Sequence, residues 1–491
     1  MNECSKKEQT HETPHFPPNL FSVTPMKHVK PIVCLQVLLG CILAAFPAPL
    51  RAGAGQLPAQ PNIVLFLADD LGWADVPWHG SPYKMPHLER LANEGVKLEA
   101  HYVHPVCSPT RAALMTGRYA SRFGVTTFQN GRALPWKTVS MAAALQSAGY
   151  ETALTGKWHL GSKPGEGPQK FGFDHGYGTL AGGCGPFNHR YKEGPFTQTW
   201  HRNGKLVEEE GHVTDLIGRE AVEWLEQRGA KPFFLYVPFT AIHLPIQEPE
   251  KWLQLNAHIT DPGQRLRAAS ATHMDAMVGE VLAALERKKL RANTLVLFLS
   301  DNGAHPPAGN QAGPYPGDYG NLKLGNDNKP WRGHKGEVYE GGIRTPGIAH
   351  WPGRLNPGEI HIPLHAVDWM PTLCTLAGAK PSGDLHWDGL NIWPVLTREA
   401  KDFPARPLYS VAPRFGAQMV RHGDWKLVIT KAENKQKKTT AAGRVTEELF
   451  NLAADPGETK NLATEQPAVL AQMKARLAEI SARDGDAKAK D

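Results

Sequence analysis

Two pairs of oxygen-bearing side chains follow apolar runs that lie far apart in the chain. Asp69 and Asp70 come directly after PNIVLFLA, and Asp301 and Asn302 come directly after NTLVLFLS. Carboxylate and amide oxygens without a Cys or His pattern beside them suit hard cations such as Ca²⁺ or Mg²⁺ rather than Zn²⁺. Acidic pairs after strands also serve as helix caps and turn formers. Two pairs in matching positions nevertheless favour a metal site.

Basic side chains occur in three short motifs that could hold an anion or move a proton. GKWHLG contains Lys157 and His159, and their i, i+2 spacing in an extended chain would put both side chains on one face. His243 follows the apolar run PFFLYVPFTAI, and Lys335 lies in RGHKGEVYEGG. Taken singly, each histidine could equally be a packed core residue, and each lysine could equally be a solvated surface residue. These basic residues support a functional site only if the fold brings them close to the metal ligands.

Cys107 stands in HPVCSPTRAALMTGRY, just before a run that predicts a helix. It could be a free buried cysteine, half of a disulfide or a thiolate nucleophile, and the last requires a His base and an orienting group. The chain has six cysteines, and Cys107, Cys184 and Cys374 are the three that follow residue 54. In an oxidising compartment an odd number means that one of them does something other than pair. A Cys184–Cys374 bridge stays open.

The apolar runs before these polar groups predict strands of one buried sheet. PNIVLFLA, PFFLYVPF and NTLVLFLS are short and continuous, which is typical of strands covered on both faces. Helix-like segments alternate with them, such as HLERLANE, VSMAAALQSA, TDLIGREAVEWLEQR and MDAMVGEVLAALERKK. We therefore expect an α/β fold with a large, mostly parallel sheet and helices on both faces. Ligands of such sheets bind beyond the carboxyl ends of the strands, where these polar groups would meet.

Two loops and a smaller domain complete the expected organisation. The Gly-, Pro- and Asn-rich stretch 303–335 and the loop with Asn188, His189 and Arg190 are long enough to be functional. After a Pro-containing linker near 385–406, short strands and a final amphipathic helix predict a small α+β domain with an antiparallel sheet. The expected boundaries are 56–385 for the catalytic domain, 400–482 for the small domain and 483–491 for a solvated tail.

Residues 1–54 predict a leader that directs export. Met26, Lys27 and Lys30 precede the apolar run PIVCLQVLLGCILAAF, and small residues at 52–54 follow it, as in a signal peptide that starts at Met26. The run is shorter than the roughly 20 residues of a membrane helix. Cleavage as a lipoprotein before Cys41 is disfavoured because the run continues past that residue. We expect an exported protein, periplasmic or extracellular, without stable membrane insertion.

The composition is that of an ordinary globular protein. Hydrophobic residues make up 41% and charged residues 21% of the 491, which excludes a fibrous or disordered chain. The net charge of +6 is spread out and forms no basic stripe, so no nucleic-acid partner is expected. A small positive excess is compatible with an anionic substrate.

Several blocks resemble one known family. CSPTR resembles the Cys-x-Pro-x-Arg signature of the formylglycine-dependent sulfatases of the alkaline-phosphatase superfamily, and the likeness extends over CSPTRAALMTGRY. PNIVLFLADDLGW, GYETALTGKWHLG, LSDNGA and RGHKGEVYEGGIRTPGIAHWPG resemble further blocks of that family in the same order. The resemblance covers most of residues 60–465 and implies an alkaline-phosphatase-like fold. It also implies that a formylglycine-generating enzyme converts Cys107 to Cα-formylglycine.

The resemblance implies a role for each polar group. Asp69, Asp70, Asp301, Asn302 and the modified residue 107 would hold one Ca²⁺ per chain. The hydrated aldehyde would attack sulfur, with S–O cleavage through a sulfo-enzyme intermediate, while Asp301 accepts the proton of the attacking hydroxyl. The other groups would anchor residue 107 (Arg111), neutralise the sulfate (Lys157 and Lys335), protonate the leaving alcohol (His243, with Lys335) and deprotonate the second hydroxyl (His159).

Within the family, LGWADVPWHGS and HLPIQEPEKWL look most like the arylsulfatase B branch, the N-acetylgalactosamine-4-sulfatases, and their bacterial relatives. The implied substrate is a sulfated carbohydrate, such as an N-acetylgalactosamine sulfate, or an aryl sulfate. Asn188, His189 and Arg190 would contact the sugar. The alternatives are a phosphoester or phosphonate monoester hydrolase of the same superfamily and a catalytically silent glycan-binding homologue.

Overall fold

The computed structural model describes residues 60–311, 313–325, 328–382, 385–400, 403–431 and 445–488. The predicted leader, with Met26 and Cys41, lies outside these ranges. Residues Leu57–Asp491 form one compact unit. In the described ranges no helix has the length and apolar character needed to cross a membrane.

A ten-stranded sheet forms the centre of this unit. Its strands run in the order β14 (Gly358–Ile360), β2 (Val96–Leu98), β13 (Gly347–His350), β9 (Thr294–Ser300), β1 (Asn62–Ala68), β8 (Phe233–Pro238), β4 (Glu151–Thr155), β5 (His175–Thr179), β6 (Trp200–Arg202) and β7 (Lys205–Leu206). The three apolar runs of the sequence are the neighbours β9, β1 and β8, and every residue in them is buried. The central strands from β9 to β5 are parallel, whereas β13, β6 and β7 pair antiparallel, so the sheet is mixed.

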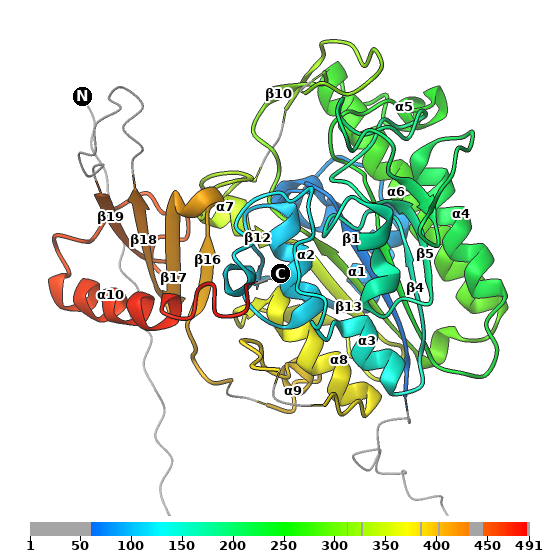
Figure 1. Ribbon diagram of the computed structural model, residues 1–491. Helices are drawn as coiled ribbons and strands as arrows, with labels where there is room; N and C mark the ends of the chain where they lie inside the picture. Colours follow the sequence, from blue (N-terminus) through cyan, green and yellow to red (C-terminus); the bar gives the residue numbers. More distant parts are fainter. Residues whose placement is uncertain are drawn as a thin grey trace, which may run out of the picture. The chain divides into compact units, whose positions relative to one another are not determined.

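Helices cover both faces of the sheet (Figure 1). Successive strand residues point to opposite faces, and in β1 Ile63 and Leu65 join one core while Val64 and Phe66 join the other. One core contains α2 (Cys107–Thr116), α3 (Met141–Ser147) and α8 (Trp369–Ala377), and the other contains α1 (Pro86–Glu94), α4 (Val213–Glu226) and α6 (Pro262–Arg287). This arrangement confirms the predicted α/β architecture.

Helix α6 begins 12 residues before the periodic run that predicted it, at Pro262 rather than Met274. Asp261 explains the earlier start, because its side chain accepts a hydrogen bond from the Gln264 amide at 2.7 Å. A capping Asp followed by Pro at the first helical position is a strong start signal. The extra turns bring His273 into the helix.

A separate antiparallel sheet follows in the C-terminal part. Strands β16 (Leu408–Val411), β17 (Ala417–His422), β18 (Trp425–Lys431) and β19 (Val445–Asn451) pair in sequence order, and α10 (Pro467–Ser481) packs on them. This confirms the predicted α+β character of the region. The segment after α10 is tied down, since Asp484 pairs with Arg122 and Asp486 with Arg118. The solvated tail expected at 483–491 stays a prediction, and its described residues 483–488 are exposed or half-buried.

Short elements complete the described chain. Strands β3 (His101–Tyr102), β12 (Arg344–Thr345) and β15 (Leu364–His365) form one small sheet, and β10 (Ala308–Gly309) pairs with β11 (Lys323–Leu324). The short helices are α5 (Glu250–Leu255), α7 (Glu340–Ile343) and α9 (Trp393–Leu396). The stretch 303–335 contains only β10 and β11 in its described residues, in line with the predicted loop.

Candidate active site

The acidic residues meet beyond the carboxyl ends of neighbouring strands. Asp69 and Asp70 follow β1, Asp301 follows β9, and Cys107 is the first residue of α2. Ligand atoms of these four residues lie within 4.8 Å of one another, and all four side chains are buried. The fold therefore produces the convergence that the strand pattern predicted.

Asn302 provides a test of whether this cluster suits a cation. Its amide nitrogen donates to Asp70 Oδ1 at 2.8 Å and to the Gly303 carbonyl at 2.9 Å. Its amide oxygen is buried and has no hydrogen-bond partner, an arrangement that is costly unless another group binds the oxygen. Three carboxylates and an amide oxygen are ligands that Ca²⁺ prefers. The residues present thus fit a hard divalent ion.

Two lysines contact the acidic cluster. Lys157 Nζ lies 2.5 Å from Asp69 Oδ2, and Lys335 Nζ lies 2.7 Å from Asp70 Oδ1. Burial raises the pKa of Asp70, but Lys335 and His243 outweigh it and hold that pKa below its usual range. The same attraction outweighs burial for Lys335 and raises its pKa. Lys335 therefore stays charged where an anionic group would bind.

The backbone around Lys157 differs from the extended chain that the sequence predicted. Strand β4 ends at Thr155, and Gly156 and His159 have φ of 139° and 58°. A side chain on Gly156 would put its Cβ 1.9 Å from the Pro238 carbonyl oxygen, so only glycine allows this approach. Lys157 and His159 consequently reach the site from a turned loop and not from one face of a strand.

Arg111 fixes the position of Asp301. Its Nε and Nη2 donate to Asp301 Oδ2 at 3.1 and 2.8 Å, while Nη1 donates to the Lys157 carbonyl at 2.7 Å. Such a fork of charged hydrogen bonds requires guanidinium geometry. Burial and the neighbouring Asp69 raise the pKa of Asp301 to about 6. Asp301 is thus a buried carboxylate that Arg111 holds beside Cys107.

The environment of Cys107 does not favour a thiolate. Its Sγ donates to Asp69 Oδ1 at 3.5 Å, and burial together with Asp301 raises the thiol pKa to about 12. A cysteine nucleophile needs a lowered pKa. Cys107, Cys184 and Cys374 are all buried and unpaired, so the bridge left open by the count does not form. Cys107 is therefore a neutral thiol next to a carboxylate cluster.

Two histidines flank the cluster. His159 is 2% exposed, neither ring nitrogen has a hydrogen-bond partner, and burial followed by Lys157 lowers its pKa well below the usual value. A Cβ on Gly182 would lie 2.5 Å from His159 Nε2, so this glycine leaves room for the ring. His243 Nε2 lies 3.9 Å from Asp70 Oδ2, and burial followed by Lys335 lowers its pKa. Both rings are neutral bases beside the lysines.

The structure adds residues that the sequence did not single out. Lys192 Nζ lies 5.7 and 5.6 Å from the ring centroids of Tyr191 and Tyr315. Burial lowers the pKa of Lys192, and the positive charges of Lys335 and Lys157 lower it further. The three ammonium groups therefore interact electrostatically. The Tyr315 hydroxyl is buried without a partner. The sequence feature that could have pointed to Tyr191 and Lys192 is their position directly after the predicted sugar loop.

The predicted sugar loop lines a cavity of about 680 Å³, together with the exposed ring of Phe187. Asn188 Nδ2 donates to the Tyr319 hydroxyl at 3.2 Å, and Arg190 lies 3.7 Å from Glu208. His189 is 4% exposed and stacks on Trp200, with its Nε2 3.0 Å from the Gly211 carbonyl. Its ring therefore supports the cavity wall, and the polar ends of Asn188 and Arg190 are the more accessible ones.

Comparison with known proteins identifies the class. The family model named Sulfatase matches residues 61–379. Arylsulfatase J of Mus musculus is 29% identical over 470 residues, which cover 86% of this chain and 76% of the relative. N-acetylgalactosamine-6-sulfatase of Rattus norvegicus is 34% identical over 389 residues, which cover 74% and 70%. The chain belongs to the sulfatase family, and it is a hydrolase of sulfuric esters.

Solved structures agree with this assignment. The crystal structure of Ps i-CgsB in complex with k-i-k-neocarrahexaose is similar with a TM-score of 0.76 and 31% identity, covering 88% of this chain and 95% of that one. The PsFucS1 sulfatase from Pseudoalteromonas sp. has a TM-score of 0.72 and 25% identity, covering 88% and 92%. The predicted alkaline-phosphatase-like fold is confirmed, whereas the narrower likeness to the 4-sulfatases stays a prediction.

Proposed function

We propose that this sulfatase acts on sulfated glycans with a formylglycine made from Cys107 and one Ca²⁺ held by the acidic cluster. The observation that carries the proposal is the position of Cys107, a neutral thiol at the start of α2 among Asp69, Asp301 and two lysines. A thiol with a raised pKa is a poor nucleophile there. When bound, the ion would supply a Lewis acid, and the hydrated aldehyde would supply the attacking hydroxyl.

The chain's own residues then have separable tasks. Arg111 orients the Asp301 carboxylate through two hydrogen bonds, and Asp301, whose pKa is about 6, takes a proton from the attacking hydroxyl. Lys157 and Lys335 balance the negative charge that builds up on the sulfuryl oxygens. Both already lie at carboxylates of the cluster, so little reorganisation is needed when the anion binds.

The histidines move protons at the two ends of the reaction. His243 Nε2 faces Asp70, and its Nδ1 is hydrogen-bonded to the Leu244 carbonyl, which leaves Nε2 for the proton delivered to the leaving alcohol. A bound sulfate beside the ring favours the protonated form. His159 has both nitrogens unpartnered and a pKa far below its usual value. Its unpartnered nitrogens leave it available to take the proton of the second hydroxyl when sulfate is expelled.

The relatives point to carbohydrate sulfates. One similar structure contains a carrageenan oligosaccharide, and one relative is named for N-acetylgalactosamine 6-sulfate. In this chain the loop with Asn188 and Arg190 lines a cavity large enough for a sugar, and Phe187 supplies an exposed ring for stacking. Lys192 adds a third cation near the sulfate-binding lysines. We therefore assign the loop with Asn188 and Arg190 to contacts with the sugar.

The test compares a panel of sulfated oligosaccharides with nitrophenyl sulfate and nitrophenyl phosphate, using protein made together with a formylglycine-generating enzyme. We expect release of inorganic sulfate by the wild type and none by Cys107→Ala. Asn188→Ala and Arg190→Ala should raise KM for the glycan and leave the aryl sulfate unaffected. Equal losses on both substrates would refute the sugar-loop assignment, and faster turnover of the phosphate would refute the proposed substrate class.

The remaining expectations are part of the same proposal. Export to the periplasm or the extracellular space rests on the apolar run after Met26. The formylglycine-generating enzyme is the expected maturation partner because the block CSPTR is present. The division into a catalytic domain at 56–385 and a small domain at 400–482 rests on the separate antiparallel sheet.

A further inference from the structure

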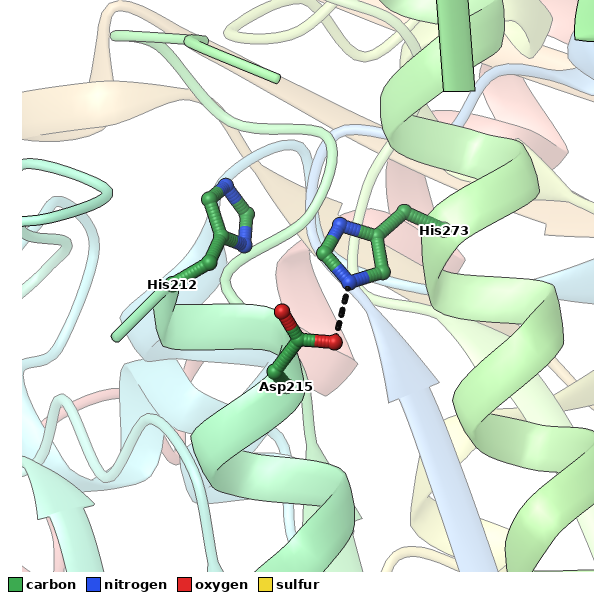
Figure 2. Close-up of side chains that lie close together, drawn as sticks. All are labelled: His212, Asp215 and His273. Carbon is green, nitrogen blue, oxygen red and sulfur yellow. Dashed lines mark hydrogen bonds and ion pairs between the residues drawn. The ribbon is translucent and has the colours of Figure 1, made fainter. Parts of the chain in front are cut away.

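A second cluster of ionisable side chains lies between α4 and α6, apart from the acidic cluster. Figure 2 shows His212, Asp215 and His273 turned toward one another. His212 caps α4, Asp215 lies in the first turn of that helix, and His273 comes from α6. One ligand atom from each residue lies within 4.8 Å of the other two. The sulfatase chemistry described above uses none of them.

The outer nitrogens of both histidines are already held. His273 Nδ1 lies 2.7 Å from Glu248 Oε2, and His212 Nε2 lies 2.9 Å from the Gln247 carbonyl oxygen. Metal-binding histidines typically donate their second N–H to a carboxylate or a backbone carbonyl, which fixes the tautomer and the ring direction. Here His273 has the Glu248 carboxylate as its partner, and His212 has the Gln247 carbonyl. Of the other two nitrogens, His273 Nε2 faces Asp215 and His212 Nδ1 faces the Thr214 amide at the start of α4, so an ion would have to replace both contacts.

The inner groups face one another. His273 Nε2 lies 2.8 Å from Asp215 Oδ1, and His212 Nδ1 accepts a long hydrogen bond of 3.2 Å from the Thr214 amide. The side chain of His273 is 0% exposed, whereas that of Asp215 is 41% exposed and opens a path to solvent. If both imidazoles are neutral, as metal ligands must be, the two carboxylates leave a net negative charge that one divalent ion would match.

We propose that His212, Asp215 and His273 bind a divalent transition-metal ion of the Zn²⁺ class, with Glu248 and the Gln247 carbonyl orienting the two imidazoles. Two imidazoles and one carboxylate are a ligand set that suits zinc and not calcium. In a tetrahedral zinc site, bonds of about 2.0–2.2 Å place the ligand atoms about 3.4 Å from one another. Here the three ligand atoms lie within 4.8 Å of one another, so they would have to approach by at most roughly 1.4 Å, and the partly exposed Asp215 side chain has room to move.

The site would connect three parts of the fold. It joins the start of α4 to the middle of α6, and through Gln247 and Glu248 it reaches the segment that begins at His243. A cavity of about 10 Å³ is lined by both His212 and His243, so the two clusters are neighbours. The ion is thus placed to hold the segment that supplies the leaving-group acid, without contacting substrate.

The competing account is that a proton takes the place of the ion. Asp215 and Glu248 outweigh burial and raise the pKa of His273, so an imidazolium between two carboxylates would also hold the cluster together. The two accounts differ in metal content, in spectra and in the effect of added Zn²⁺ on stability. None of these three measurements depends on sulfatase activity, so the result is independent of the proposed substrate and of Cys107 maturation.

The experiment strips the full-length protein with a chelator and loads it with ZnCl₂ while excess Ca²⁺ occupies the acidic cluster. After desalting, zinc and calcium are counted by mass spectrometry, and a Co²⁺-loaded sample is examined for d–d absorption. The test variants are Asp215→Ala and His212→Gln. His175→Gln is the control, because His175 Nε2 forms an equivalent 2.8 Å pair with Glu220 but lies outside the cluster.

We expect about one zinc per chain in the wild type and in His175→Gln, with a zinc-dependent rise in Tm. Asp215→Ala and His212→Gln should lose that zinc and the rise in Tm while their calcium content stays unchanged. Absence of zinc in the loaded wild type would overturn the proposal in favour of the protonated His273 network. Equal zinc in the wild type and both test variants would overturn it as well, since the ion would then be bound elsewhere.

Discussion

Lys426→Met removes the one cation that lies between two buried carboxylates. Lys426 Nζ is 2.9 Å from Glu340 Oε1 and 2.8 Å from Glu458 Oε1, and all three side chains are 0% exposed. Glu340 begins α7, shortly after Lys335, while Lys426 belongs to β18. These ion pairs therefore tie the C-terminal sheet to the segment that carries Lys335.

The expected cost follows from burial. Removing one partner of a buried ion pair typically costs about 3–5 kcal/mol, because the remaining charge is left without compensation. Glu340 keeps Arg344 at 3.5 Å and Glu458 keeps the Glu340 amide at 2.7 Å, so we expect the lower part of that range. The matched control is Lys474→Met. Lys474 of α10 pairs with Glu447 of β19, which belongs to the same sheet as Lys426, but these two side chains are 47% and 30% exposed. Screening by solvent limits such a pair to about 0.5 kcal/mol.

The cost should also depend on pH. Burial raises the pKa of Glu340, but Lys426, Arg421 and Arg344 outweigh it and hold it at about 2. The wild type therefore keeps this contribution above pH 4.5, the ordinary pKa of the group, and loses it as the pH falls toward 2. Without Lys426 the carboxylates are protonated at higher pH in the folded state. Native protein then takes up protons on acidification, and the deficit of the variant shrinks between about pH 7 and 5.

The assay is denaturant unfolding followed by tryptophan fluorescence at pH 7.5 and pH 5, with Tm as a second readout. The account predicts a much larger loss for Lys426→Met than for Lys474→Met at pH 7.5, and a smaller gap at pH 5. A loss for Lys426→Met no larger than that of the control would refute the reasoning, because the two carboxylates would then not be desolvated in the native state.

Three further predictions concern the active site. His243→Ala should lower kcat for a glycan sulfate far more than for nitrophenyl sulfate, since only the poor leaving group needs a proton; equal losses in the two rate measurements would contradict a leaving-group role. Lys192→Met should raise KM for oligosaccharides with a second sulfate by about tenfold, as loss of one charged hydrogen bond would, and a Lys137→Met protein should not differ from wild type in the same assay. Removal of divalent ions with EGTA should abolish sulfate release and lower Tm, with recovery on adding Ca²⁺ but not Mg²⁺; full activity of a protein shown by mass spectrometry to be calcium-free would speak against the metal assignment.

Much of the fold was predictable because its central strands are buried on both faces. Such strands must be continuously apolar, so β1, β8 and β9 stood out in the sequence, and the rule for ligand sites in α/β sheets then brought Asp69, Asp70 and Asp301 together. The short edge strands β6 and β7 have no such signature. They are two or three residues long and are defined by pairing, β6 with β5 and β7 with β6, which no local pattern records.

The parts of the site that escaped prediction depend on tertiary contacts. Lys157 was expected on an extended strand, but Gly156 turns the chain because the Pro238 carbonyl leaves no space for a side chain. Lys192 reaches the other lysines only because the loop around Tyr191 packs on Tyr315, more than a hundred residues later. The cluster of His212, Asp215 and His273 likewise joins two helices whose periodic patterns gave no sign of a shared site.

The central claim is that residue 107 is no longer a cysteine in the active enzyme, and mass spectrometry of the tryptic peptide 98–111 tests it most directly. The sample is full-length protein that has been shown to release inorganic sulfate from a sulfate ester. The account predicts that the thiol of Cys107 is replaced by an aldehyde and that sulfate release rises in proportion to the converted fraction. An intact thiol in a fully active preparation would contradict it.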